Sequence, residues 1–108
     1  MKVIRKTDAS LFLDGPEVCR EYCRMDQMWF GTSTLLPGQT GGIDPGHPVS
    51  KEIFFACQGT VVIRNPKDNG CYLLEEEDIL VIDEGEPHEI TNIGTKPAIV
   101  AWCGAPNA

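Results

Sequence analysis

The sequence predicts an all-β domain that folds as a sandwich or a barrel. Short segments rich in β-branched and aromatic residues recur along the chain, and turn-forming residues separate them. Eight Pro and eleven Gly are spread along the chain and do not gather in one linker, and few segments have the apolar spacing of a helix. The 108 residues suffice for one domain with a modest core. We therefore treat residues 1–108 as a single all-β domain.

The first part of the chain is expected to contribute four elements. Their bounds are 3–5, 11–13, 17–25 and 28–36. The third of these fits a strand or a helix, because its apolar residues agree with both spacings. The fourth is rich in Thr and aromatic residues, and Pro37-Gly38 closes it. A long loop follows over 38–50, and its glycines indicate that the backbone approaches another group closely.

The rest of the chain adds six short segments with strand character. Their bounds are 52–57, 60–64, 71–74, 78–82, 88–92 and 98–103. Turn clusters of Asn, Asp, Gly and Pro separate them, as at 65–70 and 83–87. Alternation along these strands predicts one buried face. The residues expected to be mostly buried are Phe54, Ile63, Leu80, Ile90 and Val100.

Charge and composition limit the partners. The net charge is −7 and the isoelectric point is about 4.6, so the chain repels phosphate backbones and nucleic acid is not expected as a partner. No apolar run reaches membrane-spanning length, and no export signal is evident at the N-terminus. We therefore expect a cytoplasmic protein with no membrane partner. The five cysteines form no CxxC pair and are expected to be reduced.

One stretch, residues 41–59, combines a Gly- and Pro-rich loop with a strand that opens on Glu52. Burying an unpaired charge is costly, so this carboxylate needs a metal ion, a hydrogen-bonded partner or a position at the wet rim of a barrel. The residues alone leave all three open. On a strand, Phe54 shares the face of Glu52 and would line a pocket beside it. By the same rule His88 and Asn92 share a face.

The stretch resembles the first sequence motif of the cupin superfamily, G-x5-H-x-H-x3,4-E-x6-G. Gly41, His47, Glu52 and Gly59 match the first Gly, the first His, the Glu and the last Gly. Val49 stands in place of the second His, and the gap to the Glu is one residue short. If the motif is instead anchored on the Glu, the histidine falls between the two His positions.

A later stretch resembles the second cupin motif, G-x5-P-x-G-x2-H-x3-N. Gly85, His88 and Asn92 match with the correct spacing, while Glu77 replaces the leading Gly and Asp83 replaces the Pro. The resemblance covers about residues 28–103. It implies a double-stranded β-helix, which is a jelly-roll-like β-barrel, often assembled as a dimer.

The resemblance also implies one divalent metal ion inside the barrel. Carried over residue by residue, its ligands would be His47, Glu52 and His88, with Asp44 replacing the missing histidine or orienting His47. Imidazole and carboxylate together suit Fe, Mn, Ni, Co or Zn. Phe54 and Asn92 are the remaining candidates for the pocket, although Asn92 suits a turn-stabilising role better than that of a ligand.

Two functions follow from the resemblance. The first is a metal-dependent enzyme that acts on a small polar molecule as an oxygenase, an isomerase or a lyase such as a decarboxylase. The second is a non-catalytic module that binds or senses a small molecule with weak or no metal, which the missing histidine favours. A homodimer is expected in either case, because the edges of one small barrel need to be covered.

Overall fold

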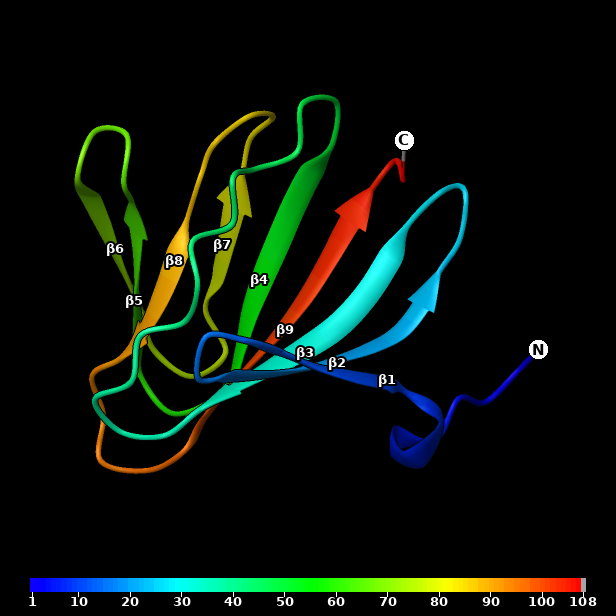
Figure 1. Cartoon of the computed structure of the whole chain (residues 1–108), viewed down its shortest axis with the longest axis horizontal. Helices are drawn as coiled ribbons and strands as arrows, with labels where there is room; N and C mark the ends of the chain where they lie inside the picture. Colours follow the sequence, from blue (N-terminus) through cyan, green and yellow to red (C-terminus); the bar gives the residue numbers. More distant parts are fainter. Residues whose placement is uncertain (108) are drawn as a thin grey trace.

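The computed structural model describes residues 1–107 and consists almost entirely of strands (Figure 1). A short 3₁₀ turn, η1 (Lys6–Asp8), precedes nine strands in this range. The strands are β1 (Ser10–Asp14), β2 (Glu17–Arg24), β3 (Trp29–Leu35), β4 (Lys51–Gln58), β5 (Val61–Asn65), β6 (Gly70–Leu74), β7 (Ile79–Ile82), β8 (Glu89–Asn92) and β9 (Ala98–Ala105). The all-β prediction is therefore confirmed.

The strands form two antiparallel sheets that together make the barrel. The large sheet has the order β1-β2-β3-β9-β4-β7, and the small sheet has the order β6-β5-β8. Figure 1 shows the small sheet at the left and the large sheet curving away from β7 to β1. The core lies on the inner faces of both sheets. Four of the five residues predicted to be buried are buried, and Leu80 is partly buried and packs against the core.

The N-terminal segment differs from the prediction, because residues 3–5 do not form a strand. Arg5 is extended but lies beside no other strand; its amide donates to Asp8 Oδ2 at 3.1 Å and its carbonyl accepts from the Asp8 amide at 2.9 Å, which closes η1. The ambiguous segment 17–25 is a strand over Glu17–Arg24, because β2 pairs with β1 from Glu17 to Glu21 and with β3 from Val18 to Arg24. Pairing between distant segments decides what local spacing leaves open.

The loop between β3 and β4 runs along the edge of β8. Backbone bridges join Thr40 to Thr91 and Asp44 to His88. At the second bridge the Asp44 amide donates to the His88 carbonyl at 2.8 Å, and the His88 amide donates back at 3.0 Å. This pairing fixes Asp44 beside His88, although 44 residues separate them in the chain.

The glycines of this loop make room for carboxylates. A Cβ at Gly41 would lie 2.0 Å from Glu17 Oε1, and a Cβ at Gly42 would lie 1.9 Å from Asp14 Oδ1. Side chains at these positions would therefore collide with the end of β1 and the start of β2. The close approach predicted from the glycine content is confirmed, and the approached groups are these two carboxylates.

Glu77 occupies the position of the leading Gly of the second cupin motif and has a φ of 73°. A residue with a Cβ pays about 1–2 kcal/mol for this left-handed conformation. Its amide donates to the Ala56 carbonyl at 2.8 Å, so the turn before β7 is tied to β4. The turn requires the conformation, which explains why the motif has Gly here.

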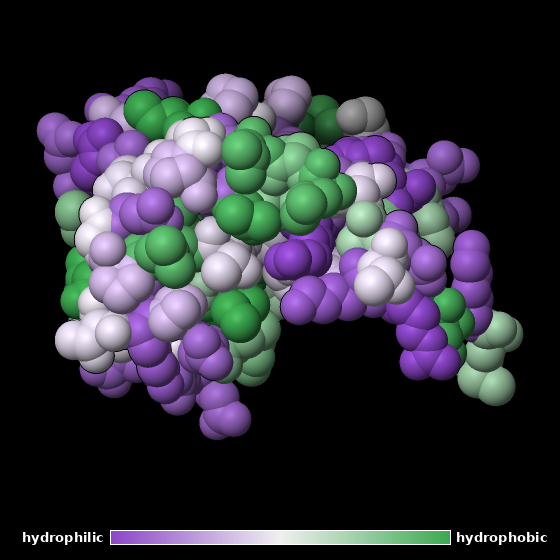
Figure 2. Space-filling model, turned by 60° about the horizontal axis from the view of Figure 1, so that its bottom comes forward, coloured by the Kyte–Doolittle hydropathy of each residue, from purple (hydrophilic) through white to green (hydrophobic). Residues whose placement is uncertain are grey.

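The outer face of the large sheet exposes apolar side chains. Ile53 pairs with Val81 and Phe55 pairs with Ile79 on β4 and β7, and these four side chains are 37–56% exposed. On the face seen in Figure 2, hydrophobic residues likewise gather in patches between hydrophilic ones, and the N-terminal segment projects at the right. Across residues 1–107 the five cysteines are free thiols. No helix within the described part of the chain has the length and apolar character to cross a membrane.

Candidate metal centre and its pocket

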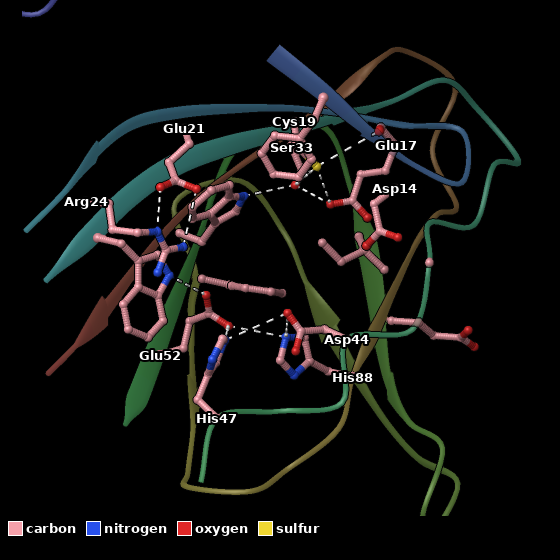
Figure 3. Close-up of a pocket in the computed structure, with 17 residues that line it drawn as sticks. Asp14, Glu17, Cys19, Glu21, Arg24, Ser33, Asp44, His47, Glu52 and His88 are labelled. Carbon is pink, nitrogen blue, oxygen red and sulfur yellow. Dashed lines mark hydrogen bonds and ion pairs between the residues drawn. The ribbon is translucent and has the colours of Figure 1, made fainter. Parts of the chain in front are cut away.

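The candidate residues line a cavity of about 130 Å³ between the two sheets (Figure 3). Glu52 lies near the start of β4, and His88 lies directly before β8. Asp44 and His47 come from the loop that pairs with β8. The sheet pairing thus brings three separate segments of the chain together at one end of the cavity.

Glu52 is only 4% exposed, and its two oxygens differ in their surroundings. Trp29 Nε1 donates to Oε2 at 3.3 Å. Trp29 can lie here because its ring packs over Gly104 of the paired strand, where a Cβ would be 1.9 Å from the ring. The other oxygen, Oε1, is buried and accepts no hydrogen bond from residues 1–107. A buried polar atom without a partner is costly and calls for an explanation.

His88 is buried and faces that oxygen. Its Nδ1 lies 3.0 Å from the Glu86 carbonyl, and since a carbonyl only accepts, Nδ1 carries the proton. Nε2 then points toward Glu52 Oε1 at 3.2 Å and Asp44 Oδ2 at 3.7 Å. Burial is the largest influence on the His88 pKa and lowers it, but the contacts with Glu52 and Glu86 and the charge of Asp44 together raise the pKa above its usual value.

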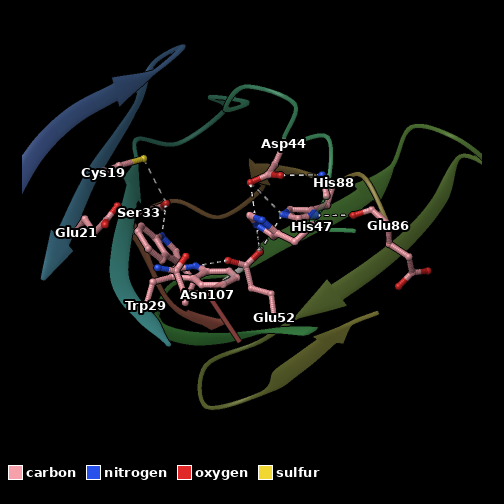
Figure 4. A network of polar contacts seen from close by, with 12 residues as sticks. Cys19, Glu21, Trp29, Ser33, Asp44, His47, Glu52, Glu86, His88 and Asn107 are labelled. Atoms are coloured by element: carbon pink, nitrogen blue, oxygen red, sulfur yellow. Dashed lines mark hydrogen bonds and ion pairs between the residues drawn. The ribbon is translucent and has the colours of Figure 1, made fainter. Parts of the chain in front are cut away.

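Asp44 and His47 complete the group (Figure 4). The Gly46 amide donates to Asp44 Oδ1 at 2.8 Å, a local turn that leaves Oδ2 free to face the centre. His47 Nε2 lies 3.8 Å from Asp44 Oδ2 and 3.8 Å from Glu52 Oε1. The His47 ring packs against Trp29 with centroids 4.7 Å apart. His47 therefore points inward.

These residues fit a divalent cation. Ligand atoms of Asp44, His47 and Glu52 all lie within 4.8 Å of one another, and His88 Nε2 approaches the same Glu52 oxygen. In its neutral form, His88 would direct a lone pair at two carboxylate oxygens, which is repulsive. A positive charge between these atoms relieves the repulsion, and nitrogen and carboxylate oxygen ligands suit Fe, Mn, Ni, Co or Zn. A proton on Nε2 would relieve it as well.

Of the two other residues that the sequence suggested for the pocket, one lines the cavity and one does not. Phe54 lines the cavity, and its ring meets the His88 ring edge-on at 5.2 Å between centroids. Asn92 does not line the cavity: its amide nitrogen donates to the Leu35 and Lys96 carbonyls, and its oxygen accepts from the Gly94 amide. Asn92 shares the buried face of His88, as predicted, but two of its three hydrogen bonds hold the turn after β8 and the third ties it to the end of β3.

Sequence reasoning missed the opposite wall of the cavity. Glu17 is 7% exposed, and its Oε2 accepts hydrogen bonds from the Ser33 hydroxyl and, at 3.3 Å, from the Cys19 thiol. Trp102 Nε1 donates to Ser33 Oγ at 2.9 Å. Burial raises the pKa of Glu17, and hydrogen bonds from Ser33 and Cys19 oppose the rise. Burial and the nearby Glu17 charge raise the pKa of Cys19 to about 12, so this thiol stays protonated.

A signal for this wall exists in the sequence. Glu17 and Cys19 are two residues apart, so a strand over 17–25 places both on one face. Reading that segment as a possible helix hid the pattern. Figure 3 shows Glu17, Cys19 and Ser33 across the pocket from His47 and His88.

Comparison with known proteins places these observations in a family. The model of the cupin domain family matches residues 31–104. A double-stranded β-helix protein from Klebsiella pneumoniae, described as uncharacterized and conserved, superposes with a TM-score of 0.83 at 17% identity, covering 99% of this chain and 91% of that one. A protein from Thermotoga maritima described as a predicted oxalate decarboxylase superposes with a TM-score of 0.79 at 17% identity, covering 97% and 99%.

A third solved structure is KdgF from Halomonas sp., with a TM-score of 0.79, 11% identity and coverage of 100% and 96%. At these identities the likeness shows the fold alone, which is the double-stranded β-helix that the motifs implied. No curated protein sequence matches this chain.

Proposed function

We propose, from the premise that the chain belongs to the cupin family, that it holds one divalent metal ion and acts there on a small polar molecule. The ligands would be His47, Glu52 and His88, with Asp44 in place of the missing histidine. One observation supports this above the others: Glu52 Oε1 is buried without a hydrogen-bond donor from residues 1–107 and lies 3.2 Å from His88 Nε2.

A bound divalent ion would polarise a substrate oxygen or activate O₂ or water, which suits an oxygenase, an isomerase or a lyase. Decarboxylation of oxalate, the activity named for the Thermotoga maritima protein, belongs to the last class. The chain's own residues would hold the site rigid. Trp29 orients Glu52, the Glu86 carbonyl fixes the His88 ring, and Phe54 limits water beside that ring.

A second candidate is a module that binds or senses a small molecule without metal. It is favoured by Val49, which stands where the motif has its second His and is 57% exposed at the surface. In this case a proton on His88 would neutralise the buried charge of Glu52. The two candidates differ in what fills the space between these side chains, so metal content separates them.

The test is elemental analysis of the purified full chain after supply of Mn, Fe, Co, Ni or Zn and removal of loosely bound ions. We expect about one ion per chain, and we expect Glu52→Gln to lower the metal affinity by roughly 100-fold, since a ligand matters at least as much as the groups that orient it. Glu75→Gln is the matched control, because Glu75 is exposed and lies outside the cavity. A wild-type protein that holds no supplied metal would reject the metal-dependent candidate and leave the second one.

A further inference from the structure

The cavity that holds the candidate metal centre is strongly acidic. Two arginines lie near the cavity. Arg24 lines its wall, and Arg64 lies behind the wall. Arg24 is paired with Glu21 at 2.6 Å, and Arg64 is paired with Glu89 at 2.6 Å. The carboxylates that line the cavity are Asp14, Glu17, Glu21, Asp44, Glu52 and Glu89.

After these two pairings, four lining carboxylates have no Lys or Arg partner among the described residues. Glu52 and Asp44 belong to the metal centre, whereas Asp14 and Glu17 belong to the opposite wall. A divalent ion offsets two negative charges and leaves the pocket negative even if Glu17 carries a proton. The excess negative charge lies away from the metal, where a second end of a ligand would sit.

The opposite wall is built to stay in place. Gly41 and Gly42 of the loop press against the carboxylates of Glu17 and Asp14, and Ser33 and Cys19 hold one oxygen of Glu17. Ser33 is in turn fixed by Trp102. The wall therefore offers carboxylate acceptors in a fixed position.

The size of the cavity limits the ligand. Its volume of about 130 Å³ is close to the roughly 150 Å³ that accommodates a benzene-sized molecule. A ligand of about six non-hydrogen atoms would therefore reach from the metal centre to Glu17 and Asp14.

We propose that the ligand of this pocket carries a hydrogen-bond donor, a hydroxyl or an ammonium group, at the end away from the metal, and that the Glu17 and Asp14 wall rejects a second carboxylate there. The inference rests on the proposed function, because it assumes that the other end of the ligand meets the metal. An ionised carboxylate only accepts hydrogen bonds, so it pairs with a donor and repels another anion. Specificity of this kind comes from the repulsive group as much as from the attractive one.

The test uses three probes that share a carboxylate for the metal and differ at the far end. These are 3-hydroxypropanoate, β-alanine and malonate, which end in a hydroxyl, an ammonium and a second carboxylate. Binding to the full chain loaded with Mn²⁺ is measured by calorimetry, with metal content determined on the same sample. We expect the better of the first two probes to bind at least about tenfold more tightly than malonate. Malonate chelates divalent ions in water. If it binds the loaded protein more weakly than the other two probes, the pocket and not the metal must cause the difference.

The variant Glu17→Gln should reduce this preference severalfold, whereas the surface control Glu75→Gln should leave it unchanged. Asp14→Asn makes the same charge change at a less buried position in the same wall, and it serves if Glu17→Gln does not fold. Which of the hydroxyl and ammonium probes binds more tightly identifies the donor.

Three outcomes would overturn the inference: malonate binding as tightly as the other probes, no binding of any probe to the metal-loaded chain, or an unchanged preference in both wall variants. A loaded protein without the preference contradicts this inference alone. A protein that takes up no metal contradicts the proposed function and the inference together.

Discussion

Each face of the large sheet carries, beside its ordinary residues, side chains of the kind usually found on the other face. The inner face carries two buried carboxylates, Glu52 on β4 and Glu17 on β2, which are 4% and 7% exposed. The outer face carries Ile53 and Phe55, the direct neighbours of Glu52 and Phe54 along β4, and both are exposed. Buried polar groups and exposed apolar patches are the informative departures from ordinary burial. The buried carboxylates motivate the proposed cation site inside, and the exposed apolar side chains motivate a proposed interface outside.

The two inner carboxylates also differ from each other. Both oxygens of Glu52 are enclosed, but one has no hydrogen-bond donor in the described range. Glu17 has two donors on one oxygen, Ser33 and Cys19. The structure therefore satisfies Glu17 with its own side chains, while Oε1 of Glu52 needs either a bound cation or a proton on His88 Nε2. Variants at each position test whether this difference is real.

The largest effect is expected at the histidines that face Glu52. His88→Ala should lower metal affinity by roughly 100-fold or more. His47→Ala should lower it about one-tenth as much, by roughly tenfold. His88 is buried and its ring is fixed by the Glu86 carbonyl, whereas His47 lies on the loop with about one-third of its side chain exposed. Titration of the metal against a competing chelator measures both affinities.

Wild-type metal content in His88→Ala would show that His88 is not a ligand and would contradict the proposed ligand set. Equal losses in the two variants would show that the loop histidine is as firmly placed as the buried one, which contradicts the difference in burial.

Much of the inner face was predictable from the sequence, because alternation is a local property. Glu52 and Phe54 on one face of a strand, and His88 and Ile90 on one face of another, follow from a period of two, and their burial agrees. The strand segments from 28 onward also agree with the structure to within a few residues. The motif spacing added the proximity of His47, Glu52 and His88, which no local pattern supplies.

The rest depended on contacts between distant segments. Asp44 reaches the centre because its loop pairs with β8, and a Gly-rich loop has no periodicity from which this pairing follows. Glu17 was missed because β2 is decided as a strand by its pairing with β1 and β3. Asn92 was considered for the pocket, but its amide nitrogen donates to the Leu35 carbonyl at the end of β3, 57 residues away in the chain, as well as to the turn after β8. In each case the deciding partner lies on another segment of the chain.

A second effect, of comparable size, is expected on the outer face. We propose that the protein is a homodimer that covers Ile53, Phe55, Ile79 and Val81, since an exposed apolar patch on a sheet is a typical interface. Phe55→Lys should then raise the dimer dissociation constant by roughly 100-fold, because a charge would be buried without a partner. Light scattering at micromolar concentration measures the mass.

Leu36→Lys is the matched control, because Leu36 is similarly exposed but lies in the loop after β3. It should leave the dimer intact. A wild-type monomer at this concentration would reject the proposal, and a dimer that survives Phe55→Lys would place the interface on another surface, such as the exposed edge strand β1.

The smallest effect concerns Glu17 and is a dependence of stability on pH. Burial raises its pKa in the folded protein above the ordinary 4.5. Well below pH 4.5 the carboxyl is protonated in the folded and unfolded chains alike, so stability does not change with pH there and the contribution of the neutral group is fully present. As pH rises through the folded pKa, the unfolded chain has already lost the proton, and the contribution of the neutral Glu17 to stability is lost.

Glu17→Gln has no proton to lose. The difference between its melting temperature and that of the wild type should therefore shift in favour of the variant as pH rises from 4.5, by on the order of a few degrees, and should then stay constant. Any loss of the Ser33 contact shifts the curve by an amount that does not depend on pH. Both proteins are melted with a chelator present, so that metal release does not contribute, and Glu75→Gln serves as the control. A gap that narrows with rising pH would mean that Ser33 and Cys19 stabilise the ionised form more than burial disfavours it. Glu17 would then be ionised in the folded protein near neutral pH, and the contrast with Glu52 would rest on the donors alone.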